Sequence, residues 1–255
     1  MSVAPRIHVL TATKSDFAVI LRRGPSRAVA SLGWHRGSGR IELAQWLRGR
    51  IKEYQSDLSP DGRHMIYFAE QGGQGATVVS RAPWLRAILH QPQDSFWGGG
   101  GAFDADGRLA GAGGTLPDGL KPVALRLGTD GFHLGEGFAA SQVRRGWRAE
   151  GEGYDVVLTR ALGHGWSLAA RIGKRAKGRA LLSLGYRLVG PKGQSLDQPG
   201  WTWADAWEGG LHAADAGVLG HLAIEPDGPG AWREIADLRG MTFEARKAPY
   251  EGVGT

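Results

Sequence analysis

Residues 54–69 read YQSDLSPDGRHMIYFA, and the interpretation of the whole chain starts from this stretch. An alternating run ends in Ser59-Pro60-Asp61-Gly62, and an apolar run follows it. Proline fixes φ at the second position of a turn, and glycine accepts the positive φ that a later position requires. The stretch therefore predicts two antiparallel strands joined by a tight turn.

A second loop of the same kind lies further along the chain. Residues 99–111 read GGGAFDADGRLAG, with DADGR in place of SPDGR. Gly62 and Gly107 are 45 residues apart, a length that four strands and their turns fill. Residues 201–219 carry a poorer copy. The spacing predicts four-stranded sheets repeated around an axis.

Short apolar or alternating segments recur along most of the chain. They are four to ten residues long, which is strand length, and glycine, Asp-Gly or proline separates almost every pair. Glycine accounts for 42 of the 255 residues, whereas its usual share is about 7%. We therefore expect one all-β domain over residues 1–255, with a large β-barrel or sandwich as the alternative.

The SPDGR string before an apolar strand resembles the blades of TolB-type and WD-repeat-like β-propellers. The longer strings AQWLRGRIKEYQSDLSPDGRHMIYFA, SRAPWLRAI and WGGGGAF also resemble a group of uncharacterised bacterial proteins with this layout. The resemblance implies an irregular propeller and carries no particular activity. About five blades can be counted, and the terminal segments could supply a sixth.

Helical patterns are few. The best helix candidate is residues 81–90, which could hold one turn before Pro92. Residues 168–177 contain good helix formers, but Gly173 interrupts them, so we predict a strand followed by a basic turn.

The composition limits the chemistry and predicts a location. With no cysteine, the chain can form no disulfide, thiolate metal site or cysteine nucleophile. The residues after Met1 contain no apolar signal segment, and no run approaches 18 apolar residues. We therefore predict a cytoplasmic protein that does not span a membrane.

The net charge of +6 is concentrated in one segment. Residues 171–179 contribute five positive charges and no negative charge. The segment predicts a basic patch of Arg171, Lys174, Arg175, Lys177 and Arg179. No aromatic residue interleaves with these charges, so stacking platforms for single-stranded nucleic acid are missing. A solvated hairpin tip is the favoured interpretation over nucleic-acid binding.

Two short patterns resemble catalytic or metal-binding sites, and neither is complete. Residues 165–169 (GWSLA) approach the nucleophile elbow of hydrolases, but that elbow needs a helix after Ser167. The eight histidines show none of the short spacings typical of zinc sites. The sequence predicts no catalytic residue, no metal and no cofactor.

Paired carboxylates offer a third possibility. Some propellers are glycosidases that use acids on their innermost strands. Asp57 and Asp205 occupy comparable positions near a strand or turn, whereas Asp61, Asp106 and Asp227 are better explained as turn formers. A hydrolase with channel carboxylates therefore remains an alternative function.

Tryptophans beside predicted loops suggest a binding surface. In residues 201–203 (WTW), strand alternation would put both indoles on one face. Exposed tryptophan and arginine often anchor interfaces, although packing between blades is an equally good explanation. The candidate binding residues are Trp84, Trp97, Trp201, Trp203 and Arg81. We expect a non-catalytic scaffold that presents its loops to a protein partner, with a carbohydrate- or ligand-binding module as the other alternative.

Overall fold

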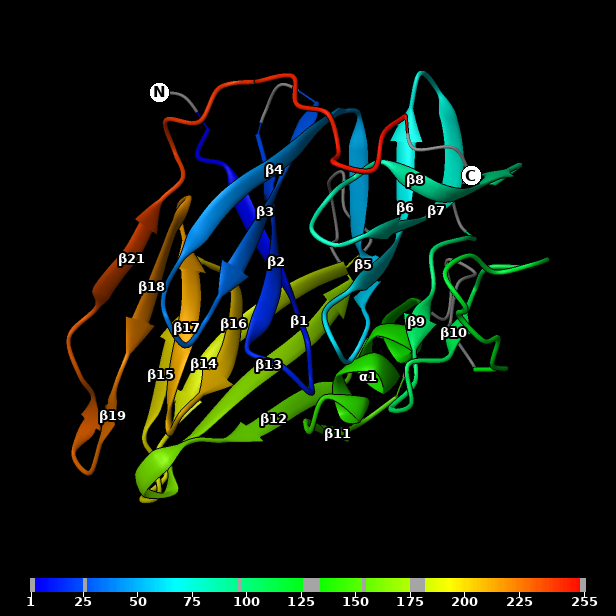
Figure 1. The fold of residues 1–255 in the computed structure, drawn as a ribbon. Helices are drawn as coiled ribbons and strands as arrows, with labels where there is room; N and C mark the ends of the chain where they lie inside the picture. Colours follow the sequence, from blue (N-terminus) through cyan, green and yellow to red (C-terminus); the bar gives the residue numbers. More distant parts are fainter. Residues whose placement is uncertain are drawn as a thin grey trace.

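The computed structural model describes residues 3–24, 27–95, 98–125, 134–152, 155–174 and 182–252. These residues form a β-propeller of four blades, which confirms the predicted fold class (Figure 1). All strand pairs within the blades are antiparallel, and each blade is built from one continuous part of the chain.

The blades follow one another along the sequence. Blade 1 contains β1 (Arg6–Thr11), β2 (Phe17–Arg23), β3 (Ala28–His35) and β4 (Ile41–Arg48). Blade 2 contains β5 (Arg50–Leu58), β6 (His64–Gln71), β7 (Gln74–Arg81) and β8 (Ala87–Gln93). Blade 3 contains β11 (Arg148–Glu150), β12 (Val157–Ala161), β13 (Ser167–Lys174), β14 (Leu182–Val189) and β15 (Ser195–Gln198). Blade 4 contains β16 (Trp201–Trp207), β17 (Gly210–Asp215), β18 (Val218–Leu222) and β21 (Arg233–Asp237); the small hairpin of β19 (Ile224–Glu225) and β20 (Gly228–Pro229) precedes β21.

The hydrophobic cores lie between neighbouring blades. One buried cluster joins Ile7 and Trp34 of blade 1 to Leu219 of blade 4, and another joins blade 1 to Tyr67 of blade 2. Central strands are consequently buried on both faces, so β3 and β6 read as nearly continuous apolar runs instead of alternating ones. Burial on both faces explains why period 2 is weak in these segments.

Tight turns explain much of the glycine content. The hairpins after β6, β16 and β17 turn through Gly72-Gly73, Glu208-Gly209 and Ala216-Gly217, and both residues of each pair have positive φ. This is the type I′ geometry, whose twist matches that of the flanking strands.

The two Asp-Gly loops adopt the same geometry. In the first, the Gly62 amide donates to the Ser59 carbonyl at 2.9 Å, and in the second the Gly107 amide donates to the Asp104 carbonyl at 3.1 Å. Gly62 has φ 78° and Gly107 has φ 81°. The copies recognised in the sequence are therefore structurally equivalent turns.

The second loop does not open a full blade, which corrects the predicted count of five or six to four. It joins β9 (Ala102–Phe103) to β10 (Leu109–Ala110), which form an isolated two-stranded sheet beside β5. Close backbone approach holds it there, because a Cβ on Gly100 would overlap the carbonyl of Gln55. The terminal segments add no further blade among the described residues.

An α-helix lies between blade 2 and blade 3. This helix, α1 (Leu134–Arg144), contacts β5 and β11 and was not predicted, because Gly135 and Gly137 weaken the helical pattern. The predicted helix at residues 81–90 is wrong: this segment forms a turn and then β8. Across the described residues, no helix is long and apolar enough to cross a membrane.

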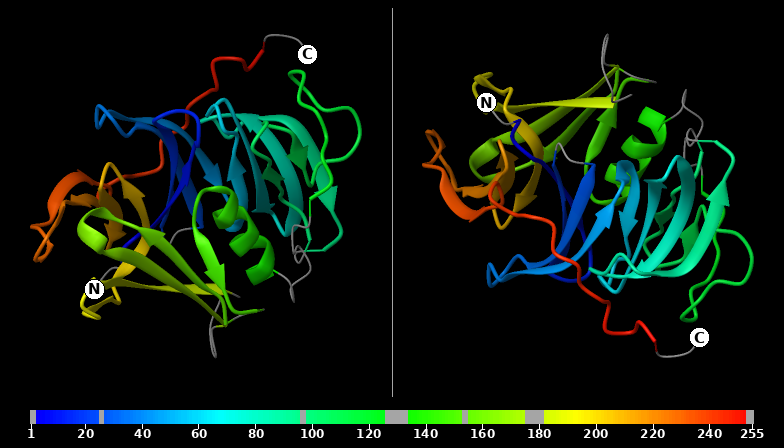
Figure 2. Two further views of the ribbon diagram at one scale, coloured as in Figure 1. Left: turned by 90° about the horizontal axis from the view of Figure 1, so that it is seen from below. Right: turned by 90° about the horizontal axis from the view of Figure 1, so that it is seen from above.

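Blades 4 and 1 close the ring through side chains and through the C-terminal segment. The Thr202 hydroxyl donates to the Ile7 carbonyl at 3.0 Å, and the buried Arg22 guanidinium donates to the carbonyls of Leu238 and Arg239. The C-terminal segment then crosses blade 1 and reaches blade 2, where the Tyr250 hydroxyl donates to the Arg86 carbonyl (Figure 2). The C-terminal segment therefore connects blade 4 to blades 1 and 2.

We expect valine at Gly62 or Gly107 to destabilise the protein by about 1–2 kcal/mol, because a β-branched residue is strained at positive φ. The loss should be larger at Gly62, where a Cβ would lie 3.1 Å from the Phe17 ring, than at Gly107, where the nearest atom is 3.9 Å away. Urea unfolding measures both. Gly185→Ala is the control, because its site is open and its φ is not in this region. Wild-type midpoints for both valine variants would refute the equivalence of the loops.

Candidate functional site

A cavity of about 500 Å³ opens at the centre of the propeller. The last residues of three strands, Thr11 of β1, Ala161 of β12 and Trp207 of β16, lie in its wall, together with Arg36 and Arg145. Because these strands belong to blades 1, 3 and 4, the site forms only when the blades are assembled around the axis.

A chain of charged groups crosses the floor of this cavity. The Arg145 guanidinium contacts the Asp57 carboxylate of blade 2 and the Ser141 hydroxyl of α1, and its Nε donates to the Thr11 carbonyl at 3.5 Å. The Arg160 guanidinium of blade 3 donates to the Arg145 carbonyl at 2.6 Å and pairs with Asp205 of blade 4 at 3.2 Å. Arg145 and Arg160 therefore connect all four blades.

Asp57 and Asp205 occupy equivalent positions, as the sequence indicated. Each carboxylate accepts from the amide of the next residue, at 2.8 Å for Leu58 and 2.9 Å for Ala206. Asp57 also accepts from the Phe103 amide at 2.8 Å, which ties the β9–β10 hairpin to blade 2. Both acids are held by arginine and by the backbone.

Arg36 differs from the other two arginines because it makes no direct ion pair among the described residues, although the charges of Asp205, Glu208 and Asp16 act on it from further away. The residue is only 8% exposed, and its Nε is sealed from solvent without a hydrogen-bond acceptor. Its Nη2 donates to the Ala206 carbonyl at 3.2 Å, while no acceptor among the described residues lies on Nη1. Burial lowers its pKa to about 10, which leaves it charged at neutral pH. A buried cation without a counter-ion is costly unless something pairs with it.

Aromatic groups hold this guanidinium in place. Its central carbon lies 4.1 Å from the ring centre of Trp207 and 5.8 Å from that of Trp34. His212 Nδ1 lies 3.5 Å from Nη2, and burial and the Arg36 charge lower the pKa of His212 to about 3. The imidazole is therefore neutral and accepts from the arginine instead of repelling it.

A second buried histidine, His8, lines a separate and smaller space. His8 borders a space of about 30 Å³, and its Nδ1 has no hydrogen-bond partner. Burial lowers its pKa to about 4, against the opposing effect of Glu53. A space of this size and polarity suits a water molecule and is too small for a larger ligand.

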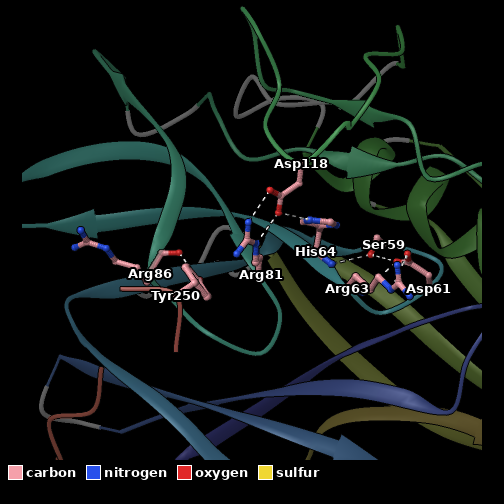
Figure 3. Close-up of polar contacts among 8 residues, drawn as sticks. All are labelled: Ser59, Asp61, Arg63, His64, Arg81, Arg86, Asp118 and Tyr250. Carbon is pink, nitrogen blue, oxygen red and sulfur yellow. Dashed lines mark hydrogen bonds and ion pairs between the residues drawn. The ribbon is translucent and has the colours of Figure 1, made fainter. Parts of the chain in front are cut away.

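A separate open groove of about 780 Å³ lies between blades 1 and 2. On its wall, Arg81 makes two hydrogen bonds to Asp118, at 2.6 and 2.8 Å, and His64 Nε2 lies 3.0 Å from the same carboxylate (Figure 3). These contacts lower the pKa of Asp118. The Ser59 hydroxyl donates to Asp61 and not to the His64 imidazole (Figure 3). These polar residues therefore hold loops together and do not form a serine–histidine pair.

The structure does not gather the predicted binding residues into one surface. Arg81 lies in the groove, and Trp84 follows it in the turn before β8. Trp201 and Trp203 are buried in different core clusters, because a register shift between them interrupts the alternation that would have put both on one face. Trp97 lies outside the described residues.

The predicted basic patch is only partly described. Arg171 is exposed on β13 and pairs with Asp155 at 2.8 Å. Lys174 ends β13, which confirms the predicted strand, but its side chain lies outside the described part, as do Arg175, Lys177 and Arg179. Ser167 begins β13 and no helix follows it, so the nucleophile-elbow geometry does not form.

Sequence reasoning missed the three arginines of the cavity. Arg36, Arg145 and Arg160 are far apart in the chain and follow no motif. A weak signal did exist at Arg36, which follows the end of β3 two residues after the fully buried Trp34. An arginine in such a turn can lie over the blade axis, but only the ring closure decides that it does.

No family model and no curated protein matches the chain. Among solved structures, the chain is similar to an acylaminoacyl peptidase in complex with Z-Gly-Gly-Phe-chloromethyl ketone, with 10% identity and a TM-score of 0.29 over 88% of this chain. The chain covers only 36% of that peptidase. It is also similar to an uncharacterised protein from Listeria monocytogenes, with 9% identity and a TM-score of 0.31, over 94% of this chain and 85% of that one. Both TM-scores are too low to support any inference about this protein.

We expect Arg145→Met to destabilise the protein by about 3–5 kcal/mol, because Asp57 would remain buried without its counter-ion. Adding Asp57→Asn should recover part of the loss. Arg171→Met, which removes an exposed pair, should leave the urea midpoint nearly unchanged. Equal effects of the two arginine substitutions would contradict the role of the axial charge chain.

We also expect stability to fall as the pH drops from about 6.5 to 4. His8 and His212 have pKa values of about 4 and 3 in the folded protein, whereas in the unfolded chain they bind protons near the ordinary histidine pKa of 6.5. The contribution of these two histidines to the free energy of unfolding is therefore fully present above pH 6.5. Below that pH it decreases by about 1.4 kcal/mol per pH unit for each histidine. Urea titrations at several pH values should show a shallower decrease in His212→Gln than in wild type, and an unchanged one in His90→Gln, whose side chain is exposed.

Proposed function

We propose that this protein is a non-catalytic binding scaffold that presents one propeller face to a protein partner, and that an anionic group of the partner enters the axial cavity and pairs with Arg36. The observation that carries the proposal is the buried guanidinium that makes no direct ion pair among the described residues and whose Nε has no acceptor. Ordinary folding disfavours such a group, and pairing with a ligand would remove its cost.

Binding is favoured over hydrolysis by the state of the two acids. Both Asp57 oxygens are already hydrogen-bonded, to Leu58 and Arg145 on one side and to Phe103 on the other. Asp205 is paired with Arg160. A glycosidase needs one carboxyl group as acid and another as base or nucleophile, both facing the substrate. The axial carboxylates are instead used to connect the blades.

A small-molecule binding module is the second candidate, and Trp207 favours it. Its indole lies in the cavity wall beside Arg36, where it could cover an apolar or sugar ring. The TolB-type and WD-repeat-like resemblance is consistent with the scaffold, as is a cytoplasmic location. Both stay part of the proposal.

Thermal unfolding in chloride, acetate, phosphate and sulfate buffers of equal ionic strength tests the proposed site. At least one anion should raise the wild-type midpoint in a concentration-dependent way, since a ligand that binds only the folded state stabilises it. Arg36→Gln should abolish this effect. Its own stability should equal or exceed that of wild type, because the uncompensated charge is gone.

Arg40→Gln is the matched control. Arg40 lies near Arg36 between β3 and β4, but it is exposed and paired with Glu42 at 2.7 Å, so the substitution removes the same charge without touching the cavity. The proposal fails if no anion stabilises the wild type, or if the effect survives in Arg36→Gln.

A further inference from the structure

The charges around the cavity limit the charge of its ligand. Three guanidinium groups border it, those of Arg36, Arg145 and Arg160. Asp57 and Asp205 neutralise the last two, which leaves a single positive charge on Arg36. Glu208, which also lines the cavity, opposes any excess of negative charge. With Glu208 counted, the formal charges of these six groups sum to zero, so a ligand with one negative charge is opposed less strongly than a phosphate dianion.

The position of Arg36 limits the shape of the ligand. Because the residue is nine-tenths buried, the anion has to enter the cavity to reach it. A volume of about 500 Å³ accommodates the end of a chain. A side chain in the middle of a folded surface would have to bring two flanking strands of backbone with it.

The remaining wall indicates what lies next to the anion. Ala12, Ala161, Leu162 and Ala206 contribute apolar surface, and Trp207 contributes an indole. None of these offers a partner for a second negative charge, and the Glu208 carboxylate in the same wall would repel one. An uncharged residue would therefore fit beside the anionic group.

We infer that the cavity binds the C-terminal carboxylate of a polypeptide whose last residue is uncharged. This inference rests on the proposed function and narrows it. The carboxylate accepts from the Nη1 group of Arg36, and the last side chain lies against Trp207. Capture of a chain end by a buried cation gives selectivity for termini over internal acidic side chains.

Two hexapeptide libraries provide the test. Both are N-acetylated, begin Gly-Ser-Gly and vary the last three positions among Gly, Ala, Val, Leu, Phe and Ser; one ends in a free carboxylate and the other in a carboxamide. Each is passed over the immobilised full chain, and the retained peptides are quantified by mass spectrometry. We expect the free-acid library to be retained at least tenfold more than the amide library.

The variants separate this inference from the proposed function. The tenfold preference should disappear in Arg36→Gln and persist in Arg40→Gln. Equal retention of both libraries, or a preference that survives in Arg36→Gln, overturns the inference. If phosphate stabilises the protein through Arg36 but the libraries do not differ, the anion site stands and the carboxylate terminus is wrong. If acetate is the one anion that stabilises the protein through Arg36, and the two libraries are retained equally, the ligand is a small acid and the inference is again wrong. If no anion acts through Arg36, both proposals fall together.

Discussion

The structure depends on Arg145, because this one residue contacts or connects every blade. Its guanidinium contacts Asp57 of blade 2 and the Thr11 carbonyl of blade 1, and its own carbonyl accepts from Arg160, which pairs with Asp205 of blade 4. The Arg145–Asp57 pair is largely shielded from water, so each of these two charges depends on the other for compensation. A ring of separately folded sheets thereby becomes one cooperative assembly. Thr202, Arg22 and the C-terminal segment make the further contacts that join blade 4 to blade 1 and reach blade 2.

The same axis holds two arginines with opposite consequences. Arg145 is fully engaged by protein groups, whereas Arg36 is buried beside Trp207 without a direct ion pair among the described residues. Burial of a cation without such a pair is unfavourable, and this is the physical reason for the ligand that we propose in the cavity. His212 can stay beside that cation only because it remains neutral.

Much of the fold was predictable because turns are local. The Ser59–Gly62 and Asp104–Gly107 loops have equivalent hydrogen bonds and positive-φ glycines, so their similarity in sequence reflected equivalent turns, although only the first belongs to a four-stranded blade. Asp57 and Asp205 were also recognised as equivalent. The blade count was not predictable, because the second loop starts a unit that ends after β10, and α1 occupies the space that follows. The residues of β9 and β10 give no sign that two further strands of a blade do not follow them.

By itself, the sequence determined the all-β class, the strand-and-turn repeat and the absence of thiol chemistry, since these follow from backbone preferences and residue types over a few neighbouring positions. Only the tertiary structure decided which side chains meet at the axis. Arg36, Arg145, Arg160 and Asp205 come from distant segments, and the strands that carry them converge only when hydrophobic packing between blades closes the ring. The register shift at Thr202, which sends Trp201 and Trp203 into different cores, likewise arises from pairing with β17 and not from the strand's own residues.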